Sequence, residues 1–425
     1  MRLSKNIAIF VNQCPYPPKF GFLSRVLSMV KGFHSLGFGI HIFSYSKTFA
    51  PWTNENISVL ENNWVSSVKL YKFTINESLQ RKLMHIMYSK IMHNGIPPFS
   101  KFHTPLGMRS WFTRQVEIID PDLIMINYAQ FDGILDHNHF KSTRRVIDTI
   151  DLHSLNLKMQ NSLRSLLPPP PIHPDQVEIK ILQEKFYENT SGIINHREFQ
   201  VFDQYSNTIA IAEKEADIIR ENTHTTIVNF LPMMHEIPKV TNSYAGSALF
   251  PTGPNLFNTQ GYLYFARRVL PLIIRNQPDF SLQVTGFLDQ NQIVPVPGII
   301  ILGFVPDLTS LFEESCFVIS PVFGGTGQQI KIIEAMAYGL PVIALRDAAE
   351  RSPLIHEVNG LVAQDANEFA EHVIRLWTDR VLCKKYGQAA RVTIQNKYSQ
   401  LHLNEELSKL LSRAYTEGNN YESQS

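Results

Sequence analysis

A glycine-rich segment followed by a lysine and a glutamate has the residue types best suited to binding a phosphate-bearing ligand. Gly324, Gly325 and Gly327 follow an apolar run, and Lys331 and Glu334 come shortly after them. Backbone amides of such a loop can approach a phosphate closely, and a helix beginning there adds its unpaired N–H groups. Glu334 stands three positions after Lys331, so both would lie on one helix face. A carboxylate there can accept hydrogen bonds from ribose hydroxyls.

The surrounding pattern places this loop between a strand and a helix. The run Phe317–Ser320 indicates a buried strand, and Ile330–Tyr338 has helical spacing. In open α/β sheets, ligands bind beyond the carboxyl ends of strands. A lone glycine-rich loop, by contrast, is more simply a tight turn with Glu334 as a solvated charge.

Strands alternate with helices through the rest of the second half, which indicates a parallel, doubly wound sheet. We expect further strands at Ala248–Pro251, Leu282–Gly286, Gly298–Leu302 and Pro341–Leu345, and helices at Gln260–Ile274, Leu308–Glu314 and Asn367–Thr378.

The first half predicts a second sheet of the same kind. We expect strands at Asn6–Asn12, Gly39–Tyr45, Asp122–Asn127, Arg145–Ile150 and Ser206–Ala212, and helices at Phe22–Leu36 and Val177–Glu188. Polar and small residues at Lys239–Ser247 suit a linker. A chain of 425 residues is long enough for two such domains. We therefore expect Rossmann-like domains at 1–238 and 248–400, then a C-terminal helix and tail at 401–425.

The stretch Asp148–His153, which contains Asp151, ends a predicted strand of the first domain. His153 is a candidate for orienting a substrate or relaying a proton, with Asp151 acting beside it. The alternative is a capped helix start with a satisfied histidine. The two aspartates lack the Asp-x-Asp spacing of a metal site, and we expect neither a metal nor a cofactor.

Composition excludes several classes of protein. The formal net charge of +1 argues against a general nucleic-acid binder. Three widely separated cysteines, Cys14, Cys316 and Cys383, form no disulfide framework and favour a cytoplasmic location. The apolar runs are too short for a membrane span, and Ile7–Val11 is too short for a signal peptide.

Residues Ser78–Val116 contain basic but no acidic residues, with leucine, methionine and isoleucine interleaved. Such a stretch suits an anionic membrane or a lipid-linked substrate, which would place the protein peripherally at the inner membrane face. The interpretation we favour is a helix that packs on its own domain with a solvated basic face.

The order of strand, glycine loop, Lys331, Glu334, Ala-Met-Ala and Gly-Leu-Pro-Val resembles the donor-site signature of glycosyltransferase family four, the group 1 enzymes of the GT-B fold. The resemblance reaches most of the chain. Similar segments are Pro15–Pro18 with Gly21 and Arg25, Arg197–Ala216, Gly303–Leu308, Asn359–Val362 and Lys385–Arg391.

This resemblance implies a retaining, metal-independent hexosyltransferase on two Rossmann-like domains with an interdomain cleft. It would move a sugar from a nucleotide-sugar to a glycan, lipid-linked or small-molecule acceptor, as in polysaccharide biosynthesis. The acceptor side would include Gly21 and Arg25, and the candidate catalytic residues are His153, Asp151 and Lys331. The expected donor-binding residues are Gly324, Gly325, Thr326, Gly327, Gln328, Gln329, Lys331, Glu334 and Val305.

The sequence departs from the family's pattern around this loop. Thr326 stands where the family usually has a second glutamate, eight residues before Glu334. Phe323 and Gln329 stand where it commonly has Arg or Lys, and Gly253–Gly261 lacks a basic pair. A non-catalytic GT-B binding or partner subunit is therefore the second hypothesis, and another enzyme on this fold is the third.

Overall fold

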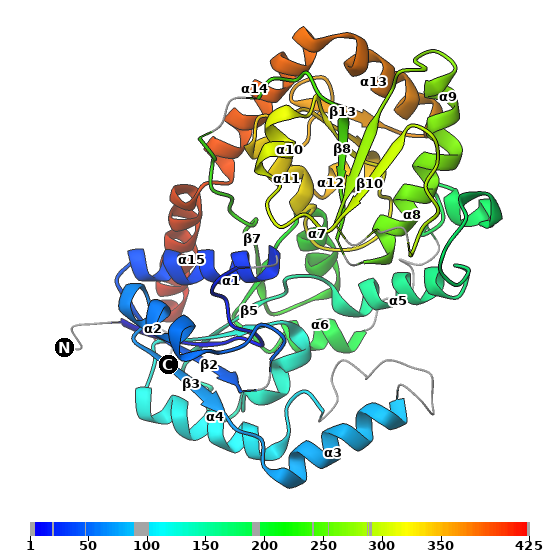
Figure 1. The fold of residues 1–425 in the computed structure, drawn as a ribbon. Coiled ribbons are helices and arrows are strands. Elements are labelled where there is room, and N and C mark those ends of the chain that lie inside the picture. The colour runs from blue at the N-terminus through cyan, green and yellow to red at the C-terminus, as the bar shows by residue number, and fades with distance from the viewer. Residues whose placement is uncertain are drawn as a thin grey trace. The chain divides into compact units, whose positions relative to one another are not determined.

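The computed structural model describes residues 5–18, 21–46, 48–88, 102–188, 196–239, 242–253, 255–286, 288 and 291–422, with side chains as far as 412. The chain forms two compact units. Unit 1 comprises residues 1–154, 195–234 and 400–425, and unit 2 comprises residues 155–194 and 235–399. Figure 1 labels many of the elements of both units.

Unit 1 is built on one seven-stranded parallel sheet in the order β3-β2-β1-β4-β5-β6-β7. Four expected strands are confirmed as β1, β2, β4 and β5, and Ser206–Ala212 contains β6. The strands are β1 (Lys5–Phe10), β2 (Phe38–Tyr45), β3 (Ser67–Tyr71), β4 (Leu123–Asn127), β5 (Arg144–Asp148), β6 (Asn207–Ala210) and β7 (Ile227–Phe230).

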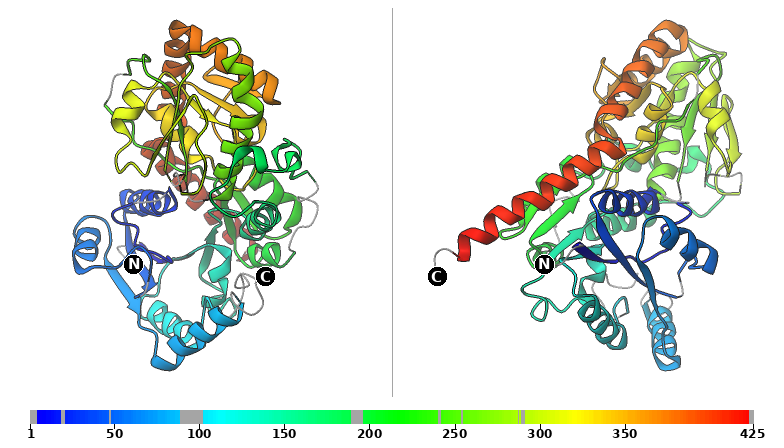
Figure 2. Two further views of the ribbon diagram at one scale, coloured as in Figure 1. Left: turned by 45° about the vertical axis from the view of Figure 1, so that its right-hand side comes forward. Right: turned by 90° about the vertical axis from the view of Figure 1, so that its left-hand side faces the viewer.

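The helices of unit 1 flank this sheet. The expected first helix is confirmed as α1 (Gly21–Ser35), which buries Val26, Val30 and Phe33 and ends before Gly37, whose φ of +82° suits glycine. Figure 2 shows α15 (Gln400–Glu422) as the long red helix, which packs against α1. The others are α2 (Asn54–Asn63), α3 (Ile75–Ile86), α4 (Leu106–Ile119), α6 (His196–Phe202) and α7 (Glu213–Asn222).

Unit 2 holds a six-stranded parallel sheet in the order β10-β9-β8-β11-β12-β13. Its strands are β8 (Ala248–Pro251), β9 (Leu282–Thr285), β10 (Ile299–Gly303), β11 (Val318–Ser320), β12 (Val342–Leu345) and β13 (Gly360–Ala363). Its helices include α8 (Leu256–Tyr264), α10 (Thr309–Glu314), α11 (Ile330–Ala337), α13 (Ala366–Thr378) and α14 (Arg380–Lys397). The expected alternation of strands and helices is confirmed.

The units divide the chain differently from the sequence-based boundaries. Residues 155–194, expected in the first domain, pack in unit 2, and the C-terminal helix α15 belongs to unit 1. The expected helix Val177–Glu188 is wrong, because this segment holds only short 3-10 turns, including Ile179–Leu182. Its apolar residues Val177, Ile181 and Leu182 instead join the core of unit 2 without a regular helix.

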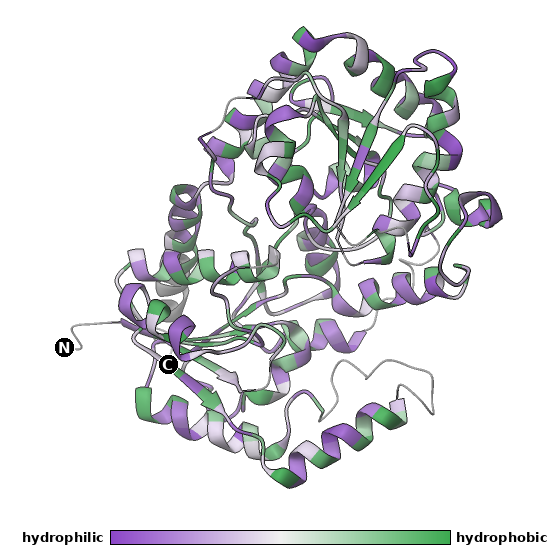
Figure 3. Ribbon diagram, in the orientation of Figure 1, coloured by the Kyte–Doolittle hydropathy of each residue, from purple (hydrophilic) through white to green (hydrophobic). Residues whose placement is uncertain are grey.

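The expected helix Gln260–Ile274 is interrupted. Between α8 and α9 (Leu270–Ile274), residues Phe265–Val269 form a π-helical turn. Pro271 has no N–H to donate to the preceding turn, and the N–H of Leu270 bonds instead to the carbonyl oxygen of Phe265. The strands of both sheets are rich in apolar residues, which are green in Figure 3.

Candidate active site

The glycine loop lies where the sequence predicts, at the carboxyl end of a central strand. Strand β11 ends at Ser320, and α11 begins at Ile330. Gly325 and Gly327 have φ angles of +107° and +69°, in the left-handed region that favours glycine. The loop therefore needs glycine at both positions, and it leads directly into a helix N-terminus.

Position 324 requires glycine because of its close neighbours, and not because of its backbone angle. A Cβ atom at this position would lie 2.4 Å from the Tyr187 ring and 2.7 Å from the Phe257 ring. The Tyr187 hydroxyl donates a hydrogen bond of 2.9 Å to Oε1 of Gln260. Sequence reasoning missed Tyr187, because its segment carries no motif and was assigned to the other domain.

Thr326, which stands where the family usually has glutamate, contacts the same segment of unit 2 as Gly324, residues 155–194. Nδ2 of Asn156 donates a hydrogen bond of 3.1 Å to Oγ1 of Thr326. Asn156 belongs to α5 (His153–Arg164). The structure thus brings Asn156 and Tyr187, both from the segment expected in the first domain, against the glycine loop within unit 2.

Lys331 and Glu334 lie on the same face of α11, as their spacing predicts. Nζ of Lys331 lies 2.8 Å from Oε2 of Glu334. The side chains are 40% and 23% exposed, so both can reach a ligand. Val305 lies half-buried in the loop after β10, next to the exposed Phe304.

Arg351 is a further residue of this site that sequence reasoning missed. Its side chain is only 5% exposed and donates hydrogen bonds to the carbonyl oxygens of Gly324 (2.9 Å) and Thr326 (3.4 Å). The side-chain amide of Gln329 accepts from both terminal nitrogens, at 2.8 and 2.9 Å, when its oxygen faces the guanidinium. Arg351 follows α12 (Arg346–Glu350), which showed no recognisable pattern in the sequence.

In unit 1, Arg25 is buried and not available to a substrate. Its Nε and Nη2 donate to the carboxylate of Asp148 at 2.7–3.1 Å, and Nη1 donates to the carbonyl oxygen of Leu231 at 2.7 Å. The two side chains are 1% and 0% exposed. This corrects the expectation of an acceptor contact for Arg25. Its guanidinium instead hydrogen-bonds to β5 and to the segment after β7, and so links α1 to both. Gly21 is the first residue of α1.

His153 begins α5, and its helix start is capped by a carboxylate from elsewhere in the chain. Oε1 of Glu198 accepts from the N–H of His153 (3.0 Å), and Oε2 accepts from the N–H of Ser154 (3.2 Å). Burial lowers the pKa of the His153 imidazole, which therefore stays neutral at neutral pH. The capped helix start is thus present, and it leaves the imidazole able to accept a proton.

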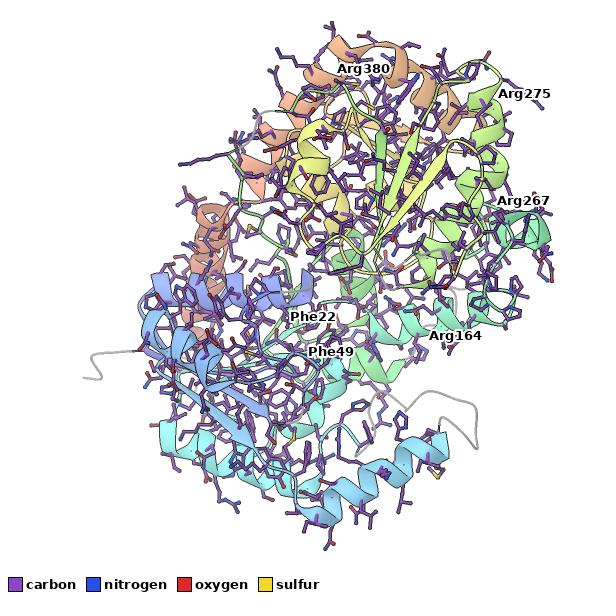
Figure 4. All side chains as sticks on the ribbon, in the orientation of Figure 1. Phe22, Phe49, Arg164, Arg267, Arg275 and Arg380 are labelled. Atoms are coloured by element: carbon purple, nitrogen blue, oxygen red, sulfur yellow. The ribbon has the colours of Figure 1, made fainter. Side chains whose placement is uncertain are left out.

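Buried carboxyl groups gather at the same edge of the sheet. Glu215 of α7 is 4% exposed, and both its carboxyl oxygens have no hydrogen-bond partner among the described residues. Burial, with the charge of Asp151 second, raises the pKa of Glu215 well above its usual range. Burial likewise raises the pKa of the Tyr128 hydroxyl, beside Asp151 and Asp148. Phe22, labelled in Figure 4, packs its ring against Tyr128 at 6.3 Å between centroids.

Residues 249–379 match the family model described as "Glycosyl transferases group 1". This confirms the resemblance to group 1 glycosyltransferases, and the matched segment contains the glycine loop, Lys331, Glu334 and Arg351. A curated protein of Klebsiella pneumoniae, "Uncharacterized 44.6 kDa protein in cps region", is 21% identical over 211 residues. The alignment covers 44% of this chain and 51% of that relative, so the chain spans about half the relative's length.

Solved structures of glycosyltransferases share the fold over almost the whole chain. Sucrose-phosphate synthase from Thermosynechococcus elongatus has a TM-score of 0.62 at 13% identity, covering 97% of this chain and 99% of its own. HepE from Anabaena, solved with UDP and glucose, has a TM-score of 0.60 at 12% identity, covering 96% and 100%. TarM from S. aureus, in a complex that includes UDP, has a TM-score of 0.57 at 12% identity, covering 96% and 99%. The GT-B fold is confirmed.

The acid-free stretch Ser78–Val116 divides into two differently packed helices. α4 buries Met108, Phe112 and Val116, which fits the expected internal packing. α3 buries no residue in the described part of the chain, and Ile75, Leu79, Leu83 and Met87 are 88%, 56%, 57% and 38% exposed. The favoured interpretation is therefore wrong for α3. Residues 89–101, including Lys90, Ile91, Met92 and Lys101, lie outside the described residues.

In the part of the chain that the structure describes, no three His, Cys, Asp or Glu side chains are grouped as a metal site. Cys14, Cys316 and Cys383 are buried free thiols. Within the same residues, each helix is too short or too polar to cross a bilayer.

Proposed function

We propose that this protein is a glycosyltransferase of family four that moves a hexose from a nucleotide-sugar to a carbohydrate or lipid-linked acceptor. One observation carries the proposal: the glycine loop, Lys331 and Glu334 stand together at the carboxyl end of β11. The unit that holds them matches the group 1 model. The donor's diphosphate would bind along Gly325–Lys331, its ribose on Glu334 and its base beside Val305.

Transfer breaks the bond between the anomeric carbon and the β-phosphate oxygen and forms a bond to an acceptor hydroxyl oxygen. The leaving diphosphate gains charge, and the loop N–H groups, the helix N-terminus and Lys331 are the groups that stabilise it. The acceptor hydroxyl loses a proton, and neutral His153 is our candidate to receive or orient it, with Asp151 beside it. We propose that no metal takes part and that the anomeric configuration is retained.

The substrate classes are proposed from the relatives. HepE was solved with UDP and glucose, which favours a uridine diphosphate sugar as donor. The Klebsiella relative is named for a cps region, which favours a role in polysaccharide biosynthesis in the cytoplasm.

A donor-hydrolysis screen tests the proposal. Purified protein is incubated with UDP-, ADP- and GDP-hexoses, and release of the nucleoside diphosphate is measured with and without candidate acceptors. We expect slow hydrolysis of one donor class, accelerated by the acceptor. Tight nucleotide binding without hydrolysis or transfer would instead favour a non-catalytic binding subunit. Lack of both would reject the donor site.

We also propose that α3 contacts an anionic membrane surface peripherally. Ile75, Leu79, Leu83 and Met87 recur every four positions and therefore share one exposed side of the helix. Lys72 and Lys82 are exposed nearby in the sequence, and the one acidic residue of α3, Glu77, lies in its first turn. Each lysine near an anionic surface contributes about 1 kcal/mol, so binding would weaken with salt.

Co-sedimentation with vesicles of phosphatidylglycerol and phosphatidylcholine tests the membrane contact. We expect binding at low salt that is lost at high salt and in the double variant Leu79→Gln, Leu83→Gln. Ile118→Gln is the control, because Ile118 is equally apolar and exposed but lies on α4. Equal binding by all three proteins, or none by wild type, would reject this contact.

A further inference from the structure

The buried guanidinium of Arg351 hydrogen-bonds to the backbone of the glycine loop. Arg351 donates to the carbonyl oxygens of Gly324 and Thr326, and its Nη2 lies 2.5 Å from Oδ1 of Asp347. Its Nε is buried and has no hydrogen-bond partner among the described residues. The backbone N–H of Gln329 in turn donates to the carbonyl oxygen of Arg351 at 3.0 Å. The loop and Arg351 thus form one hydrogen-bonded group.

These contacts decide which way the loop amides point. In a trans peptide the C=O and the following N–H point in opposite directions. Because the Gly324 and Thr326 carbonyls face Arg351, the N–H groups of Gly325 and Gly327 face away from it. Neither N–H has an acceptor within the part of the chain that the structure describes. A loop whose residues alternate between ordinary and left-handed backbone angles makes such N–H groups converge on an anion.

The positive charge of Arg351 is also placed to suit an anionic ligand at this loop. Phe323 and Gln329 provide no cation, so Lys331 and Arg351 are the cations next to the glycine loop. The guanidinium of Arg351 lies directly behind the loop, with the half-exposed Asp347 as its ion-pair partner. Because Arg351 is nearly fully buried, its charge acts on a ligand in a poorly screened environment.

We propose that Arg351 is a positioning residue for the phosphates of the donor: it turns the amides of Gly325 and Gly327 toward a nucleoside diphosphate and supplies charge that positions 323 and 329 lack. The inference rests on the proposed function. It assigns Arg351 no direct contact with the ligand. A role of this kind affects recognition of the phosphates and leaves recognition of the nucleoside unchanged.

Calorimetry on the full chain tests this. We choose the nucleoside diphosphate that wild type binds most tightly among UDP, ADP and GDP, and measure its affinity and, by competition, that of its nucleoside. Arg351→Gln should weaken diphosphate binding at least about tenfold, as loss of hydrogen bonds from a charged group does. Nucleoside affinity should stay within about twofold. Arg351→Lys keeps the charge but cannot bridge both carbonyls, and it should fall between wild type and Arg351→Gln.

Controls separate this role from a general loss of structure. Arg375→Gln removes another arginine of unit 2 that pairs with a carboxylate, Glu357, and should leave both affinities unchanged. Thermal unfolding without ligand checks that each variant folds; if Arg351→Gln does not, Arg351→Lys carries the test. Equal loss of diphosphate and nucleoside binding, or a diphosphate loss under about threefold, overturns the inference alone. If wild type binds no nucleoside diphosphate, the inference and the proposed function both fail.

Discussion

Lys331 and Glu334 form an ion pair one turn inside α11, with 2.8 Å between Nζ and Oε2. The pair sits at the end of the glycine loop, where the N–H groups of Gly325 and Gly327 have no acceptor among the described residues. A lysine has three N–H donors, so Lys331 can keep this contact and still donate to a phosphate. The second carboxylate oxygen of Glu334 stays available to ribose hydroxyls. The pair therefore holds both side chains in position before the donor binds.

Removal of Lys331 should weaken nucleoside diphosphate binding more than removal of a surface lysine. We expect Lys331→Ala to lower affinity about 10- to 150-fold, because a hydrogen bond to a charged group contributes roughly 1.5–3 kcal/mol. Isothermal calorimetry measures this, with Lys397→Ala on α14 as the control. A loss below about threefold, or under 1 kcal/mol, would mean that the diphosphate binds elsewhere.

Chelation should leave transfer unchanged. We place the stabilisation of the leaving diphosphate on the loop amides, the α11 N-terminus and Lys331, none of which needs a metal. Initial rates are compared after dialysis against EDTA and after addition of Mn²⁺ or Mg²⁺. Complete loss with EDTA and recovery with Mn²⁺ would contradict the donor-site account.

Removing one partner of the buried Arg25–Asp148 pair should destabilise the fold strongly. We expect Arg25→Met to lower the free energy of unfolding by about 3–5 kcal/mol, because it leaves Asp148 buried and uncompensated. Urea denaturation measures the change. Arg220→Met removes an exposed arginine that pairs with Asp217 and should cost no more than about 1 kcal/mol. Similar losses in the two variants would show that burial of the pair has little effect.

Glu215 should make the fold less stable as the pH rises. Burial raises the pKa of Glu215 in the folded state, whereas in the unfolded chain it ionises near its usual value of 4.5. Above that pH the folded state holds a proton that the unfolded state has lost, so stability falls with rising pH toward the folded pKa. Glu215→Gln should remove this decline. The free energy of unfolding, measured between about pH 5 and pH 8, should therefore fall less in the variant. Parallel curves for the two proteins would exclude a raised pKa.

The sequence predicts the elements that bear strong local signals. The glycine loop needs left-handed backbone at Gly325 and Gly327, and only glycine adopts it easily, so its position could be read directly. Buried parallel strands such as β8 and β12 appear as short apolar runs and were placed within about one residue. Lys331 and Glu334 share a face because helical spacing requires it.

Residues that depend on long-range contacts could not be predicted. Three residues that contact the glycine loop, Arg351, Tyr187 and Asn156, lie in no motif. Arg351 and Asn156 hydrogen-bond to Thr326 from 25 and 170 positions away in the sequence. The same applies to Arg25, whose burial depends on Asp148 across 123 positions. The exposure of α3 was missed because its apolar spacing is the same whether the helix packs internally or faces outward.

The most direct test of the central claim is the transfer activity of Glu334→Ala with the donor that wild type uses. Glu371→Ala on α13 serves as the control, since Glu371 is an exposed glutamate of the same unit. We predict that Glu334→Ala unfolds at the wild-type temperature but has lost transfer, whereas Glu371→Ala retains full activity. Wild-type turnover by Glu334→Ala would contradict the assignment of the donor site to the glycine loop and α11.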